Sequence, residues 1–322
     1  MKVKKIFYIA SIIPVALIIL SCSHRNQTGR WEKRVDMPTG RWMHSAVVIN
    51  DQIYVLGGAT AVNAPVVSTL EVYDPAADSW IKKSNMPTPR SHLATAVVDG
   101  KIYAIGGSVG PPTWSGLASV EVYDPVKDTW SIKTEMPTAR LEPHASVLKG
   151  KVYVMGGLTD DFKGLSIVEI YNPETDSWST ANNMTYGRGA LSTCAVDGTI
   201  FALGGISAVG ELALSVVETY NAEKNTWELR TWMPTPRSHL GTAVVNNKIY
   251  AVGGSISKPD RSLATFEVYD PQKDKWSFLP NMPTKRQCVS ASVVDGKIYV
   301  IGGTTEQVPW PGFQTVEVYI PN

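Results

Sequence analysis

The chain has 322 residues and a formal net charge of +1 at pH 7, from 30 basic residues (Lys and Arg) and 29 acidic ones. This balance produces no long-range field of either sign, which argues against nucleic acid as a partner. Hydrophobic residues make up 43% of the chain, and its 26 glycines, 21 prolines and 10 tryptophans favour a sizeable core built from short strands and tight turns.

The first 22 residues differ from the rest of the chain. A basic start with three lysines precedes an apolar run over residues 6–20, which is short for a spanning helix of about 20 residues. The run has the size and flanks of a signal peptide. Its end, Leu20-Ser21-Cys22, resembles the bacterial lipobox, which implies cleavage before Cys22 and lipidation of that cysteine. The alternative is an ordinary secretory signal followed by a cysteine that has no such role.

Lipidation would hold the protein at a membrane through Cys22, in the periplasm or at the cell surface. Ser23 is similar to the sorting signal of Gram-negative outer-membrane lipoproteins. Residues 23–28 would form a short polar tether that keeps the following domain close to the membrane.

Residues 29–322 carry an internal repeat. Each repeat contains a Gly-Gly pair, an arginine 16 residues before it, a methionine four residues before the arginine and a tryptophan six residues before the methionine. The pairs begin at Gly57, Gly106, Gly156, Gly204, Gly253 and Gly302. The arginines are Arg41, Arg90, Arg140, Arg188, Arg237 and Arg286. We expect each tryptophan to cover a glycine pair, because paired glycines allow close approach of another group.

The repeat resembles that of the Kelch family. The shared features are the double glycine, a downstream tyrosine, a tryptophan seven residues after it and a Met-Pro-x-x-Arg segment, in which Thr185 replaces the proline once. The resemblance covers about residues 29–322 and implies an all-β, six-bladed propeller.

The residues of one repeat predict a blade independently. Residues 94–98 and 101–105 read as two strands joined at Asp99-Gly100, a dipeptide typical of a two-residue hairpin turn. Residues 120–123 and 129–133 follow as a third and a fourth strand. Four antiparallel strands that recur radially form a propeller blade.

The sixth repeat ends at Asn322 before its fourth strand, and the missing piece lies at the other terminus. Residues 29–36 carry Trp31 at the standard offset from the first Met-Pro segment. We therefore expect this segment to supply the outer strand of the last blade, so that no sheet edge stays open at the closure.

The six arginines allow two interpretations. They could ring the channel mouth and attract an anion. Alternatively they pair with a glutamate that precedes the tyrosine of every repeat, because a feature repeated in every blade favours a structural role. The glutamates are Glu71, Glu121, Glu169, Glu218, Glu267 and Glu317.

Residues that differ between repeats are the better candidates for a binding site. In antiparallel blades the Met-Pro-x-x-Arg turns and the loops after Gly-Gly share one face, where variable loops on a rigid scaffold typically bind ligands. The candidates are Trp42, His44, His92, Glu142, His144, His239, Gln287, Trp114 and Trp310. Exposed aromatics beside polar groups could stack on sugars or grip a peptide, or could instead pack their own loops. We expect no cofactor and no metal, since no two of His44, His92 and His144 have metal-ligand spacing in the sequence.

Three functions are compatible with this sequence. The first is a non-catalytic, monomeric binding propeller at the bacterial envelope that engages a protein or a glycan through the loop face. The second is a sugar-active enzyme similar to the periplasmic Kelch mutarotases for sialic acid. The third, a copper oxidase, is disfavoured because Cys194 and Cys288 fall in or beside innermost strands. We expect no disulfide between these two cysteines, because they occupy different positions of non-adjacent repeats.

Overall fold

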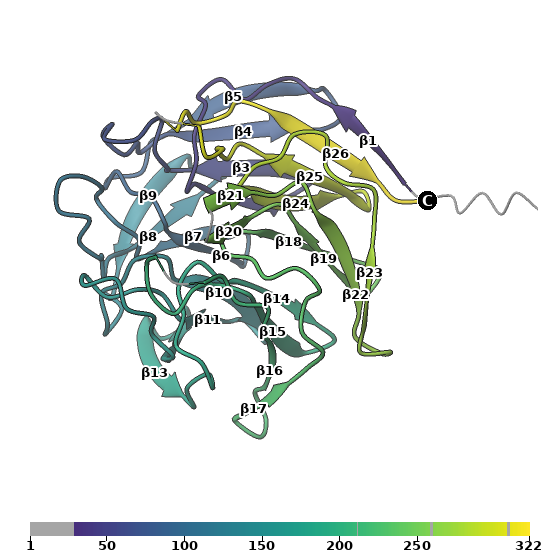
Figure 1. Cartoon of the computed structure of the whole chain (residues 1–322). Helices are drawn as coiled ribbons and strands as arrows, with labels where there is room; N and C mark the ends of the chain where they lie inside the picture. The colour runs from purple at the N-terminus through teal and green to yellow at the C-terminus, as the bar shows by residue number, and fades with distance from the viewer. Residues whose placement is uncertain (1–28, 211, 258–259, 308–309) are drawn as a thin grey trace, which may run out of the picture.

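The computed structural model describes residues 29–210, 212–257, 260–307 and 310–322. These residues form six four-stranded antiparallel sheets and one short hairpin, and the sheets are arranged radially as the blades of a propeller (Figure 1). None of the described residues forms a helix that could cross a membrane. The predicted signal peptide (1–22), the tether (23–28) and Cys22 lie outside the described residues.

Each blade runs from its innermost to its outermost strand. Blades 1 and 2 contain β2 (Ser45–Ile49), β3 (Gln52–Leu56), β4 (Leu70–Asp74), β5 (Ser79–Lys83), β6 (Ala94–Val98), β7 (Lys101–Ile105), β8 (Val120–Asp124) and β9 (Thr129–Lys133). Blades 3 and 4 contain β10 (His144–Leu148), β11 (Lys151–Met155), β12 (Val168–Asn172), β13 (Ser177–Ala181), β14 (Ser192–Val196), β15 (Thr199–Leu203), β16 (Val217–Asn221) and β17 (Thr226–Leu229). Blades 5 and 6 contain β18 (Gly241–Val245), β19 (Lys248–Val252), β22 (Phe266–Asp270), β23 (Lys275–Phe278), β24 (Ser290–Val294), β25 (Lys297–Ile301), β26 (Val316–Ile320) and β1 (Arg30–Lys33). The hairpin of β20 (Ser255–Ser257) and β21 (Asp260–Ser262) follows β19.

The predicted strands and turns of the second repeat are confirmed. Strands β6, β7 and β9 have the expected bounds, and β8 extends one residue further than predicted. Asp99 and Gly100 have φ angles of 49° and 69°, which is the backbone conformation that a type I′ hairpin turn requires.

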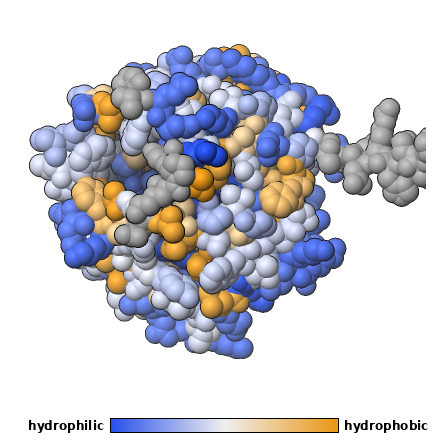
Figure 2. Space-filling view, viewed as in Figure 1, coloured by the Kyte–Doolittle hydropathy of each residue, from blue (hydrophilic) through white to orange (hydrophobic). Residues whose placement is uncertain are grey.

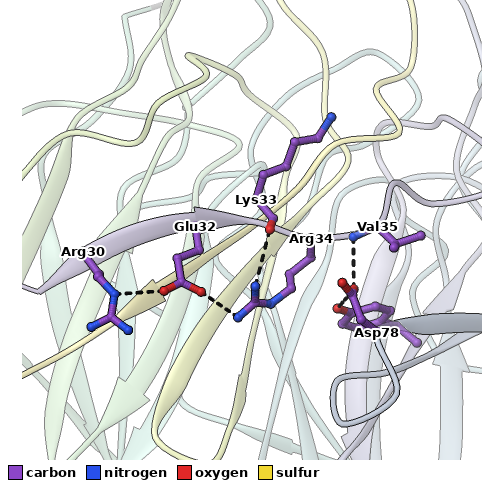
Figure 3. A network of polar contacts seen from close by, with 7 residues as sticks. Arg30, Glu32, Lys33, Arg34, Val35 and Asp78 are labelled. Atoms are coloured by element: carbon purple, nitrogen blue, oxygen red, sulfur yellow. Dashed lines mark hydrogen bonds and ion pairs between the residues drawn. The ribbon is translucent and has the colours of Figure 1, made fainter.

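The N-terminal strand closes the ring, as predicted. Strand β1 pairs antiparallel with β26, and Trp31 lies opposite Tyr319. Figure 3 shows how the chain continues into blade 1, where the amide of Val35 donates a hydrogen bond of 3.0 Å to Oδ1 of Asp78. Residues 30–35 are therefore hydrogen-bonded to both the last blade and the first.

The six arginines form the buried Arg–Glu pairs of the structural interpretation, and every arginine side chain is 0% exposed. In the fourth blade, Arg188 Nη2 lies 2.8 Å from Oε2 of Glu218. The arginine carbonyl also accepts a hydrogen bond from the second glycine of the preceding blade, and the series closes with Gly303 donating to Arg41. These arginines therefore join neighbouring blades and are not available to a ligand at the channel mouth.

The expected role of the tryptophans was wrong. A Cβ at Gly57 would meet the carbonyl of Arg90 and the side chains of Met86 and Leu93, all from the next blade. Each tryptophan instead packs on the tyrosine of its own blade and donates a hydrogen bond to the segment before that blade. Trp80 illustrates this arrangement, with its ring 5.0 Å from that of Tyr73 and its Nε1 3.2 Å from the Val35 carbonyl oxygen.

Candidate functional site

Two cavities meet on the propeller axis. An inner cavity of about 260 Å³ is lined by the innermost strands, and an outer cavity of about 450 Å³ is lined by the loops. The boundary between them is a ring that takes one residue from each blade, two positions after each arginine. We call this set the mouth ring: Met43, His92, Glu142, Ala190, His239 and Cys288.

The mouth ring has the same backbone conformation in every blade. Its six φ angles lie between 51° and 55°, a left-handed conformation that is uncommon for residues other than glycine. Hydrogen bonds between successive blades hold this backbone. The amide of His92 donates to the Met43 carbonyl over 2.8 Å, and the amide of Glu142 donates to the His92 carbonyl over 3.1 Å. The scaffold is therefore uniform while its side chains differ.

Two imidazoles of the mouth ring converge on the carboxylate of a third mouth-ring residue. Oε1 of Glu142 lies 3.3 Å from Nε2 of His92 and 3.2 Å from Nε2 of His239. Each imidazole is positioned through its other nitrogen, because Nδ1 of His92 lies 2.9 Å from the Ser91 hydroxyl and Nδ1 of His239 lies 3.2 Å from the Ser238 hydroxyl. Sequence reasoning listed the three residues separately and did not predict that they meet.

Blade 4 lies between blades 3 and 5 and carries small residues beside the contact between Glu142 and His239. Ala190 is the mouth-ring residue of that blade, and a Cβ at Gly189 would collide with Leu158 and come within 3.3 Å of Glu142 Oε2. The Glu142 side chain is 10% exposed, and its Oε2 has no hydrogen-bond partner among the described residues. One carboxylate oxygen is thus bound by the two imidazoles, and the other is buried without a hydrogen-bond partner among the described residues.

The electrostatics of the cluster favour a charged Glu142 beside a neutral His92. Burial would raise the pKa of Glu142, but its interactions with His239 and His92 outweigh burial and leave that pKa below its ordinary value. Burial lowers the pKa of His92 to about 4, although the Glu142 charge acts in the opposite direction. Near neutral pH the carboxylate is therefore ionised and accepts hydrogen bonds only.

Aromatic side chains line the outer cavity. Trp42 and Trp310 meet edge to face with ring centroids 5.6 Å apart, and Trp114 meets the imidazole of His92 at 5.6 Å. Phe162 completes the aromatic lining. The Nε1 of Trp42 is buried and has no acceptor among the described residues. Figure 2 shows hydrophobic residues on the face of Figure 1 in separate patches among hydrophilic ones.

The remaining predicted residues divide into two groups. Gln287 lines the outer cavity with the tryptophans. His44 and His144 line the inner cavity, where burial lowers their pKa values to about 3 and about 4. His44 packs on Gly302, and Nδ1 of His144 lies 2.9 Å from the Thr193 hydroxyl. These two histidines therefore belong to the channel interior, while none of the six arginines lines either cavity.

Sequence reasoning missed Ala190, Cys288 and the two serines that position the imidazoles. The available signal was the position two residues after each arginine, which identifies the whole mouth ring once the repeat is aligned. Cys194 and Cys288 are not joined in a disulfide. Among the described residues, no group of three or more His, Cys, Asp or Glu side chains has the arrangement of a metal site.

The fold and the axial cavity define a closed six-bladed β-propeller. The chain belongs to the Kelch-repeat family, because the profile of the KLHDC2/KLHL20/DRC7 Kelch-repeats domain matches residues 16–205 and 131–303. A Kelch motif also matches residues 285–322. The solved structure of YjhT is similar, with a TM-score of 0.76 and 17% sequence identity over 89% of this chain and 96% of that one. At this identity the similarity shows a shared fold. A comparison with curated proteins finds no match.

Proposed function

We propose that this protein is an envelope-associated binding propeller that holds a sugar-sized ligand, such as the end of a glycan, in its outer cavity. One observation carries the proposal: two side chains that line this cavity each have a buried polar atom without a partner among the described residues, the donor Nε1 of Trp42 and the acceptor Oε2 of Glu142. Buried polar groups are normally hydrogen-bonded. A sugar hydroxyl can both donate and accept, so a sugar would satisfy both atoms.

The size and the walls of the cavity support this assignment. A volume of about 450 Å³ falls within the range of about 300–1,000 Å³ that is typical of small-ligand sites. Trp114 and Trp310 are partly exposed and line it. Indole faces stack on the apolar faces of sugar rings and retain an N–H for a hydrogen bond.

The proposal includes export and a membrane tether. The segment before Cys22 would direct export and be removed, and the lipidated Cys22 would attach the propeller to a bacterial membrane, with residues 23–28 as the spacer. The cavity would then face ligands of the cell envelope. Mass spectrometry of the protein made in bacteria tests this part, since lipidation adds acyl chains to the peptide that begins with Cys22.

Substitution of the cavity tryptophans tests the binding site. We expect Trp114→Ala and Trp310→Ala each to weaken the binding of a monosaccharide about tenfold, which corresponds to about 1.4 kcal/mol. Isothermal titration calorimetry with a panel of monosaccharides measures the change. Trp232→Ala is the matched control, because Trp232 is 51% exposed and lines neither cavity. Full affinity in both cavity variants would place the site elsewhere.

The Glu142 cluster favours a second candidate, a sugar mutarotase. A carboxylate with adjacent imidazoles can act as a general base and acid at an anomeric hydroxyl. The described residues of the outer cavity include no Lys or Arg to pair with the carboxylate of sialic acid, so a neutral or basic sugar suits the site better. NMR of anomer exchange tests this function. Wild-type exchange at the uncatalysed rate would exclude it, and exchange that falls in Glu142→Gln would support it.

A further inference from the structure

Among the described residues that line the outer cavity, Glu142 supplies the only carboxylate, and none is a Lys or an Arg. The six arginines nearby in sequence are buried in pairs with their own glutamates. Their charges are therefore already balanced, and the Glu142 carboxylate has no cationic side chain of Lys or Arg as its counter-ion. An ionised carboxylate that is nine-tenths buried is stable when a partner of opposite charge or several donors compensate for its lost hydration.

The two imidazoles stabilise this charge through one carboxylate oxygen only. Both approach Oε1, while Oε2 has no partner. The aromatic lining formed by Trp42, Trp114 and Trp310 is also suited to a cation, because the faces of indole rings attract positive charge. A single buried carboxylate within an aromatic wall is thus complementary to an ammonium group and unfavourable to an anion.

We infer that the ligand of the outer cavity carries an ammonium group that binds Oε2 of Glu142, and that the ligand class is an amino sugar with a free amine. This inference rests on the proposed function for the sugar part of the ligand. The charge part rests on Glu142 and the tryptophans alone, so the two parts can fail separately.

Glucosamine and N-acetylglucosamine are the matched probes, because acetylation removes the positive charge and leaves the sugar ring unchanged. We expect calorimetry at pH 7 to show glucosamine binding at least tenfold more tightly than N-acetylglucosamine, and sialic acid binding more weakly than either. In Glu142→Gln the preference for glucosamine should disappear. Thermal melting of the variant checks that it is folded.

A second pair of variants leaves Glu142 in place. Phe162 lines the outer cavity and is 37% exposed, so Phe162→Lys adds a positive charge at the rim and Phe162→Gln adds only polarity. We expect Phe162→Lys to weaken glucosamine binding at least threefold relative to Phe162→Gln, and the two variants to bind N-acetylglucosamine equally. Trp232→Ala again serves as the control outside the cavity.

The outcomes separate the two proposals. Equal binding of glucosamine and N-acetylglucosamine, or tighter binding of sialic acid, would overturn the ammonium inference and leave the sugar site standing. Tetramethylammonium or a lysine peptide that binds in a Glu142-dependent way, without any sugar binding, would support the ammonium site and overturn the sugar site. Absence of binding by every probe at millimolar concentration would overturn both.

Discussion

Two positions that lie two residues apart in every repeat behave in opposite ways. The first is an arginine in all six blades, fully buried and paired with a glutamate. The second is the mouth ring, where the blades carry methionine, histidine, glutamate, alanine, histidine and cysteine in turn. At the mouth ring the φ angle lies between 51° and 55° in all six blades, so only the side chains differ there. The position that is the same in every blade therefore joins the blades. The position whose side chain changes from blade to blade, on a repeated backbone, is where a ligand can be recognised.

Removal of the closing strand should have the largest effect. Deletion of residues 29–36 removes β1 with Trp31 and leaves the edge of β26 unpaired. It also removes the hydrogen bond from Val35 to Asp78. We expect the deleted protein to lose its single cooperative unfolding transition, as measured by circular dichroism during heating. The point variant Trp31→Ala should lower the melting temperature and keep one transition. An unchanged midpoint after the deletion would contradict closure by β1.

Substitutions in one turn of blade 4 compare the two positions directly. Arg188→Met leaves the buried carboxylate of Glu218 without its partner, which should destabilise the protein by about 3–5 kcal/mol. Ala190→Ser, two residues further on, should change stability by less than about 1 kcal/mol, because it lies at the cavity. Urea unfolding measures both changes. Equal effects at the two positions would remove the distinction drawn above.

Acid should destabilise the fold through its buried histidines. The pKa is lowered from 6.5 to about 3 for His44 and to about 4 for His92 and His144, mainly by burial. The unfolded chain takes up these protons near pH 6.5 and the folded chain does not, so stability falls as the pH drops from 6.5 toward 4. Each histidine contributes a loss on the order of 3 kcal/mol by pH 4.

Unfolding in urea at pH 7, 5.5 and 4.5 measures this dependence. His144→Gln removes one of the three groups and should make the decline shallower, although it also alters the hydrogen bond with Thr193. The comparison is therefore made between slopes against pH and not between absolute stabilities. A slope identical to that of the wild type would contradict the assignment of His144 as a histidine that is neutral in the folded state.

The fold could be predicted because each of its rules acts within one repeat. The glycine pairs, the Asp99-Gly100 turn and the offset of Trp31 are local signals that recur at fixed spacing. The Arg–Glu pairing was also accessible, since both residues recur in every repeat. The side chain that packs on the glycine pairs was predicted wrongly. It is the methionine of the next blade, so the contact depends on how blades pack against each other.

The candidate site was predictable only as a set of residues on one face. His92, Glu142 and His239 come from blades 2, 3 and 5, so their meeting depends on the radius of the ring and on the small Ala190 between them. His44 was expected on that face as well, but it lies behind the mouth ring against Gly302. A repeat gives the position of a residue within a blade, whereas convergence across the axis is a property of the closed ring.

The pairing of β1 with β26 has a consequence for biosynthesis. Arg30 lies opposite Ile320, so the first strand of the propeller to leave the ribosome finds its partner only in the last one. Five blades can assemble in order as the chain emerges, but the sixth waits until β26 has been made. In an exported protein, the ring would then close only after β26 had crossed the membrane.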